Sequence, residues 1–176
     1  IRAADDSLPP VRIEISRTIP RHSGLGSGTQ LALAVARAVA GLAEPGSGSV
    51  ELARRVGRGL RSGIGIHGFD HGGFLVDAGG RDEQEVAALV ARANVPEAWR
   101  VVLAGPVAGE GLSGDAEREA FTRCREMPWD VTRTLAALLL QQVLPGLNAG
   151  DIDEAGEGLF LFGRLVGESF ASVQGG

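Results

Sequence analysis

The sequence predicts an α+β fold, and three observations lead to this class. A short stretch near the start alternates apolar and polar residues as a strand does, a glycine-rich loop runs directly into an apolar helix, and apolar residues recur at helical spacing through the second half. The chain has 176 residues, which is enough for one ordinary domain or for one domain and part of another.

Composition narrows the classes of partner. Hydrophobic residues make up 44% and charged residues 22%, as in a soluble globular protein, and the net charge of −5 gives no support to a nucleic-acid or membrane surface. Small molecules are therefore the expected partners. A single cysteine, Cys124, excludes an internal disulfide framework and a multi-cysteine metal site, and no apolar run reaches membrane-spanning length, so we expect a cytoplasmic protein.

The first third of the chain combines a strand, a loop and a helix. Val11, Ile13 and Ile15 alternate with polar residues, which predicts a strand with one face on a core. A glycine-rich loop follows at 20–30. The helix predicted over 30–42 has only two strongly polar side chains, so we expect it to be buried on nearly all sides.

The middle of the chain begins with Ser49, which is expected to cap a helix over 50–57. Residues 58–73, the second glycine-rich segment, contain too much glycine for a helix and are predicted as a loop that runs into a short strand at 74–76. The later predicted elements are a helix over 83–93, a strand over 99–104, a loop over 105–114, and helices over 115–125, 131–144 (capped by Asp130) and 151–170.

The loop at 20–30 has the features of a phosphate cradle. Gly24, Gly26 and Gly28 let the backbone turn sharply and bring several N–H groups toward one point, where the positive end of the helix dipole also points. The chain contains no lysine, so the backbone would hold the anion. The alternative is a tight turn whose glycines serve packing. The predicted phosphate-binding residues are Ser23, Gly24, Gly26, Ser27, Gly28 and Thr29.

Three strings of the sequence resemble a known family. The loop from Pro20 to Gly28 is similar to the nucleotide-phosphate loop of the GHMP kinase superfamily. HSGLGSGTQLALAVA, RSGIGIHGFDHGGFLVDAGG and GLSGDAEREAF resemble a narrower branch, the β-ribofuranosylaminobenzene 5′-phosphate synthases of methanopterin biosynthesis. The resemblance implies a two-layer fold in which an N-terminal α/β sandwich domain is followed by the helical start of a C-terminal domain.

The branch implies a transferase reaction. 4-Aminobenzoate, or 4-hydroxybenzoate, would condense with phosphoribosyl pyrophosphate, with Mg²⁺ and no organic cofactor, and CO₂ and pyrophosphate would be released. Many GHMP kinases carry a catalytic aspartate directly after Ser-Gly-Ile in the second motif, whereas Ser62-Gly63-Ile64 is followed here by Gly65. Because the synthase reaction takes no proton from an alcohol, the loss of that carboxylate agrees with the synthase reading.

The resemblance also suggests residue roles. Asp70 is predicted to stabilise the ribose cation or hold Mg²⁺, with His71 as a second catalytic residue, whereas the alternative for both is a polar loop tip. Arg58 and Arg61 are candidates for the aromatic carboxylate or the 5′-phosphate, or are solvated loop arginines. The remaining substrate-binding candidates are Ser62 and His22, and His22 can equally pack against the strand.

Two domains are predicted from the resemblance. Residues 1–106 would form the phosphate-loop domain without its first strands, and residues 107–176 the helical part of a truncated C-terminal domain. A homodimer is left open. Two other functions are also left open: an ATP-dependent small-molecule kinase of the same superfamily, and a catalytically dead protein that retained the phosphate loop.

Overall fold

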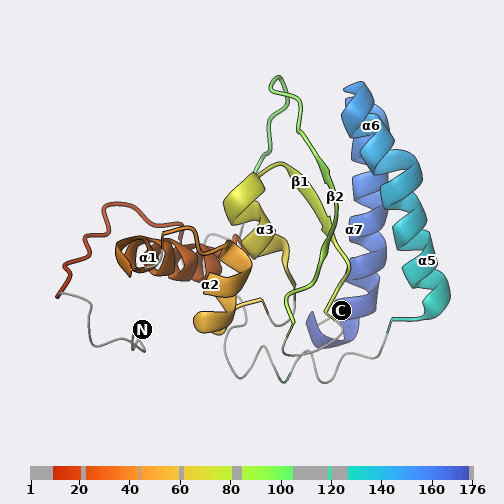
Figure 1. Cartoon of the computed structure of the whole chain (residues 1–176). Coiled ribbons are helices and arrows are strands. Elements are labelled where there is room, and N and C mark those ends of the chain that lie inside the picture. Colours follow the sequence, from red (N-terminus) through yellow and green to blue (C-terminus); the bar gives the residue numbers. More distant parts are fainter. Residues whose placement is uncertain are drawn as a thin grey trace. The chain divides into compact units, whose positions relative to one another are not determined.

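A computed structural model describes residues 10–20, 23–43, 45–59, 62–80, 85–104, 119 and 127–174. The described part contains helices and one small two-stranded antiparallel sheet, so the predicted α+β class is confirmed (Figure 1). The chain divides into two compact units between Arg92 and Ala93, and each unit is described by itself. The predicted boundary near residue 106 stays a prediction.

The described residues of the first unit form three helices and most of the sheet. Its elements are α1 (Ser27–Ala43), α2 (Ser49–Arg55), α3 (Ile64–His71), β1 (Phe74–Asp77) and β2 (Leu89–Ala93). The three helices pack around one another, and β1 lies beside β2 (Figure 1). Their core consists of Leu33, Ala36, Leu52, Ala53 and Ile66, with Phe69 and Val86 among the half-buried residues packed against it.

Helix α1 forms where it was predicted but buries only one face. Leu33 and Ala36 are buried, whereas the side chain of Leu42 is 60% exposed. The expectation that the helix is buried on nearly all sides is therefore wrong. Many of the apolar residues of this segment are alanines. Exposing the small alanine side chain to water costs little free energy, and alanine has a high intrinsic helix propensity.

Helix α3 occupies a segment that the sequence predicted as a loop. Its glycines are positions of close packing: a Cβ on Gly65 would lie 3.2 Å from the Cγ2 atom of Thr29, and a Cβ on Gly68 would lie 3.6 Å from Leu75. Ile66 brings an aliphatic side chain into the core. Tertiary contacts therefore outweigh the low helix propensity of glycine here, and Gly72, with a φ of +58°, ends the helix.

The predicted helix over 83–93 is wrong where the structure describes it. Leu89–Ala93 forms β2 instead, paired with β1, and the N–H group of Ala78 donates to the carbonyl of Ala88 at 2.9 Å. Three apolar residues at helical spacing fit either element over so short a run, and the neighbouring strand decides between them.

Two predicted strands are absent from the described residues. The segment containing Val11, Ile13 and Ile15 leaves these side chains 45–52% exposed, and Val101 and Val102 are 80% and 86% exposed. A strand requires a hydrogen-bonded neighbour, and within the described ranges neither segment joins the two-stranded sheet. The predicted helix over 115–125 and the loop over 105–114 lie almost entirely outside the described residues.

Over residues 127–174, the second unit consists of two long helical segments that lie side by side. Helix α5 (Trp129–Leu138) continues through a π-helical segment, η1 (Leu139–Val143), into α6 (Leu144–Ala149), and α7 (Ile152–Gln174) packs beside them (Figure 1). Pro128 rather than Asp130 precedes the first turn of α5. The helix was expected to stop at Pro145, but this residue stands in the first turn of α6, directly after the π-helical segment, and the helical backbone continues past it.

Candidate functional site

The loop before α1 has a backbone that only glycine adopts readily. Gly24 and Gly26 have φ values of +73° and +68°, in the left-handed region. The carbonyl of Gly26 accepts the N–H groups of Thr29 and Gln30, both at 3.1 Å, and so begins the helix at Ser27. The N–H groups of Ser27 and Gly28, the first two of the helix, have no helical carbonyl one turn earlier to bond, and they point out of the helix end toward the loop.

Gly28 differs from the other two glycines of the loop. Its φ is not positive, and the three nearest described atoms to a Cβ built on it belong to the guanidinium group of Arg58, at 3.7–3.9 Å. Neither backbone strain nor a steric clash therefore requires glycine at this position. What a Cβ would fill is the space between the first turn of α1 and Arg58.

A helix-ending motif after α2 positions Arg58 next to the first turn of α1. Gly57, with a φ of +64°, follows α2; its N–H group bonds to the carbonyl of Arg54 at 3.2 Å, and that of Arg58 bonds to Ala53 at 2.8 Å. These two bonds form a Schellman motif. A guanidinium group and a helix N-terminus are both electropositive, so their approach is unfavourable unless an anion lies between them.

Ser62, a predicted substrate contact, is hydrogen-bonded to Asp77. Its hydroxyl donates to Oδ2 of Asp77 at 2.8 Å, and the N–H group of Gly63 donates to the same oxygen at 2.7 Å. The carboxylate at the end of β1 thus lies at the electropositive N-terminus of α3, a favourable position for a negative charge. These contacts give Ser62 a structural role, and its contact with a substrate stays a prediction.

Position 65 lies beside the cradle. The side-chain amide of Gln30 donates to the carbonyl of Gly65 at 2.6 Å, and Thr29 is in van der Waals reach of the same residue. At the first turn of each helix, the backbone of α3 therefore meets the side chains of α1. A side chain at position 65 would stand next to the predicted phosphate site.

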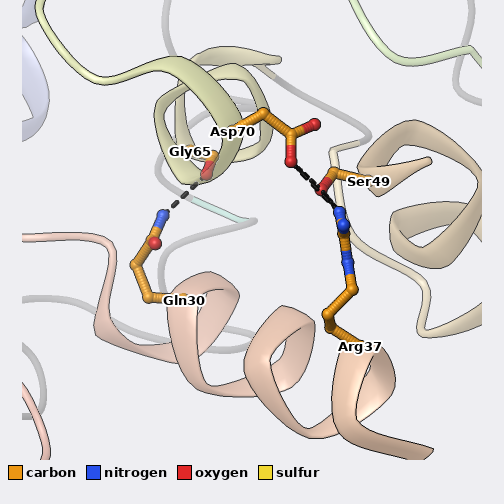
Figure 2. A network of polar contacts seen from close by, with 5 residues as sticks. All are labelled: Gln30, Arg37, Ser49, Gly65 and Asp70. Atoms are coloured by element: carbon orange, nitrogen blue, oxygen red, sulfur yellow. Dashed lines mark hydrogen bonds and ion pairs between the residues drawn. The ribbon is translucent and has the colours of Figure 1, made fainter. Parts of the chain in front are cut away.

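Asp70 takes part in a network with Arg37 and Ser49 (Figure 2). Its Oδ1 atom accepts the hydroxyl of Ser49 at 2.6 Å and a guanidinium N–H of Arg37 at 3.1 Å, and Arg37 also contacts the hydroxyl of Ser49. Ser49 is buried and its hydroxyl is turned to this network, so its predicted role as a helix cap is wrong; Gly48 precedes the first turn of α2. The three residues tie α1, α2 and α3 together.

The distance of Asp70 from the cradle follows from helix geometry. Asp70 lies five residues beyond Gly65 on α3, about 7.5 Å along the axis, and Arg37 lies seven residues beyond Gln30 on α1, about 10 Å. The structure thus brings Gly28, Arg58 and Gly65 together around the loop and holds Asp70 at the far end of the same helix pair. The catalytic role of Asp70 stays a prediction.

The histidines of α3 have different environments. His67 contacts the carbonyl of Ala87 through Nε2 at 2.8 Å, whereas the side chain of His71 is exposed. The guanidinium of Arg92 donates to the carbonyls of His71 and Gly72 at 3.2 and 3.1 Å, which places a cation at the negative end of α3. The His71 backbone thus helps to fix the helix end, and its side-chain role stays a prediction.

Two predicted site residues, His22 and Arg61, lie outside the described residues. Within the described ranges, no three or more His, Cys, Asp or Glu side chains gather as metal ligands would. None of the helices described there has the length and apolar character to cross a membrane.

Sequence reasoning missed Gln30, Arg37 and Asp77. Gln30 and Arg37 are the two strongly polar residues of an otherwise apolar helix, and polar residues in such a setting usually meet specific partners. That pattern was a usable signal for both. Asp77 carried no comparable signal, because its partners lie 14 and 15 residues away and meet it only when α3 forms.

Comparison with known proteins shows a similarity to one protein family. Residues 1–76 match the family model described as GHMP kinases N terminal domain. The chain is also similar to three curated proteins called beta-ribofuranosylphenol 5'-phosphate synthase. They come from Methanothermobacter thermautotrophicus (38% identical over 167 residues; 88% of this chain and 50% of the relative), Archaeoglobus fulgidus (36% over 159; 84% and 50%) and Methanocaldococcus jannaschii (32% over 161; 84% and 49%).

These matches confirm the resemblance inferred from the three sequence strings, although the relatives' name refers to a phenol rather than to an aminobenzene. The chain spans about half the length of the curated relatives that it matches. The glycine loop, α1, α2, α3 and most of β1 all fall within the matched 76 residues. Residues 1–76 are therefore similar to the N-terminal domain of the GHMP kinases.

Proposed function

We propose that this chain provides the phosphate-binding part of a transferase that joins a phosphorylated ribose to a phenol ring in methanopterin biosynthesis. The relatives' name supports the product class. The observation that carries the proposal is the space between Gly28 and Arg58, which lies at the first turn of α1 beside a position 65 that has no side chain. A phosphate or pyrophosphate group fits the charge of that space.

The proposed substrates are phosphoribosyl pyrophosphate and an aromatic acid. The word phenol in the relatives' name favours 4-hydroxybenzoate over 4-aminobenzoate. The ring carbon that bears the carboxylate attacks C1 of the ribose, and the C1–O bond breaks to release pyrophosphate. The carbon–carboxylate bond then breaks, its electron pair restores the aromatic ring, and CO₂ leaves. One carbon–carbon bond forms, and no oxidant or reductant is required.

Each part of the cradle has a role in this scheme. The N–H groups at the start of α1 hold phosphate oxygens, and the guanidinium of Arg58 balances their charge from the other side. When the C1–O bond breaks, the leaving pyrophosphate takes the electron pair and gains negative charge. Positive charge nearby stabilises this developing negative charge. No group has to remove a proton from an alcohol, so the absence of a carboxylate at position 65 is compatible with the reaction.

Magnesium is expected to arrive with the substrate. Mg²⁺ in phosphate enzymes is commonly held by one or two carboxylates, water and the phosphates themselves. Asp70 does not fit the role of a dedicated ligand, because its Oδ1 atom already accepts from Ser49 and from the cationic Arg37. We therefore assign no step to a protein-bound metal.

Two measurements test the proposal. Calorimetric titration of the chain with pyrophosphate tests the cradle, and Arg58→Gln, which removes the charge but keeps a polar side chain, is its matched variant. The reaction is tested on the intact protein, incubated with phosphoribosyl pyrophosphate and carboxyl-labelled 4-hydroxybenzoate or 4-aminobenzoate, by counting released CO₂.

The outcomes separate the functions under consideration. Release of labelled CO₂ that depends on phosphoribosyl pyrophosphate supports the transferase, and the better acid identifies the ring. ATP-dependent phosphorylation of a small molecule without CO₂ release would instead identify a kinase. Pyrophosphate binding with neither activity would identify a phosphate-binding protein that has lost catalysis.

A further inference from the structure

Gln30 is bonded to both sides of the contact between the cradle and α3. Its backbone N–H group bonds to the carbonyl of Gly26, at 3.1 Å, and its side-chain amide donates to the carbonyl of Gly65, at 2.6 Å (Figure 2). The side-chain bond is partly buried. One residue in the first turn of α1 therefore fixes the last glycine of the loop before the helix and the first turn of α3.

The two helices have little freedom at this point. A Cβ on Gly65 would lie 3.2 Å from the Cγ2 atom of Thr29, so the backbone of α3 lies close against the Thr29 side chain there. Such a close approach is sensitive to small changes, because packed interiors have few voids to absorb a shift. Loss of the bond from Gln30 would allow α3 to move away from Thr29 and the first turn of α1 to loosen.

We propose that Gln30 is a positioning residue for the anion cradle, acting through the carbonyls of Gly26 and Gly65. This inference rests on the proposed function of the cradle. Gln30 does not bind the anion; it holds the N–H groups of the first turn of α1 in the arrangement that binds it. Preorganised donors of this kind bind anions more tightly than donors that must be ordered on binding.

The structure offers a matched control for this role. Arg37 and Asp70 tie the same two helices together, about 10 Å farther along α1 from Gln30. Breaking that tie also removes a hydrogen bond between α1 and α3, but not near the loop. A residue that only holds the fold together would affect stability, wherever its bond lies, and would leave the cradle unchanged.

The experiment compares three variants of the whole chain. Gln30→Met keeps the length of the side chain but removes the donor, Gln30→Lys retains a donor, and Arg37→Met breaks the distant tie. For each variant we would measure the pyrophosphate affinity by calorimetry, the melting temperature, and the hydrogen exchange of the Thr29 amide, which is bonded to Gly26.

We expect Gln30→Met to weaken pyrophosphate binding by about five- to tenfold, the effect of losing one hydrogen bond. Exchange of the Thr29 amide should become faster in the same variant. Gln30→Lys should recover most of the affinity. Arg37→Met should lower the melting temperature while its affinity stays within about twofold of the original chain.

The inference is overturned if Gln30→Met binds pyrophosphate as the original chain does, or if Arg37→Met weakens binding equally. Failure of the proposed function is a separate result, in which the original chain itself binds no pyrophosphate. The exchange of the Thr29 amide then decides: unchanged exchange in Gln30→Met overturns the positioning role, and faster exchange upholds it.

Discussion

Replacing Gly28 by alanine separates the stability of α1 from its capacity to bind an anion. Gly28 lies in the first turn of the helix, its φ is not positive, and the nearest described atoms to a Cβ there would be those of the Arg58 guanidinium, at 3.7–3.9 Å. Alanine therefore fits without strain. Because side chains on a helix lean toward its N-terminus, the added methyl group would point into the space assigned to the anion.

The two effects have opposite signs. Alanine is a better helix former than glycine by up to about 1 kcal/mol, which corresponds to a rise of about 2–4 °C in the melting temperature for a chain of this size. The methyl group would keep an anion from contacting the N–H groups of the first turn. Losing one charge-assisted hydrogen bond amounts to about 1.5–3 kcal/mol, so pyrophosphate should bind about ten- to a hundredfold more weakly.

The assay pairs thermal melting with calorimetric titration of pyrophosphate, and Gly26→Ala serves as the contrasting variant. Gly26 has a φ of +68°, a conformation that disfavours a residue with a Cβ by about 1–2 kcal/mol. Gly26→Ala should therefore lower both the melting temperature and the affinity. Only Gly28→Ala should move the two in opposite directions.

Unchanged pyrophosphate affinity in Gly28→Ala would refute the reasoning, because the space between the helix and Arg58 would then have no role in binding. A lower melting temperature would refute the geometric part, since it would mean that a Cβ is not accommodated there. Both outcomes can be interpreted, because the substitution is not expected to prevent folding.

Three further predictions concern other parts of the first unit. Arg58→Gln should weaken pyrophosphate binding several-fold, and the difference from the original chain should shrink as salt is added, which titrations at increasing salt would measure. Asp70→Asn should lower the stability by less than about 1 kcal/mol, since Asn can still accept from Ser49 and the ion pair is partly exposed; reduced turnover at unchanged stability would instead favour the catalytic role. Gly59→Ala should destabilise the chain strongly in chemical denaturation, because its φ is +91° and the new Cβ would lie only 2.3 Å from Cδ1 of the buried Ile66; wild-type stability would contradict this packing.

Local chemistry explains which elements the sequence predicted well. Helix α1 follows from a run rich in alanine and leucine after a glycine loop, and β1 from a short apolar run bounded by glycines. Helix α7 was predicted from its apolar spacing, and Asp151 caps it by accepting the N–H groups of Asp153 and Glu154. Each of these signals is contained within a few residues.

The elements that were predicted wrongly depend on partners distant in sequence. Helix α3 is stable because Gly65 packs on Thr29 and Ile66 fills the core between α1 and α2. These contacts cannot be predicted from the composition of the α3 segment. Residues 89–93 form a strand because β1 lies beside them. The hydroxyl of Ser49 meets Asp70 rather than capping its own helix because α3 brings that carboxylate to it.

The sequence by itself predicted the α+β class, the similarity to the GHMP kinases and the position of the glycine loop, because spacing and glycine placement are local properties. Only the tertiary structure decided which residues stand around that loop. The Schellman motif after α2 brings Arg58 to Gly28, and the contact between α1 and α3 places Gly65 beside Thr29. Asp70, a predicted catalytic residue, is hydrogen-bonded to Arg37 and Ser49, because successive turns of a helix carry their side chains to different neighbours.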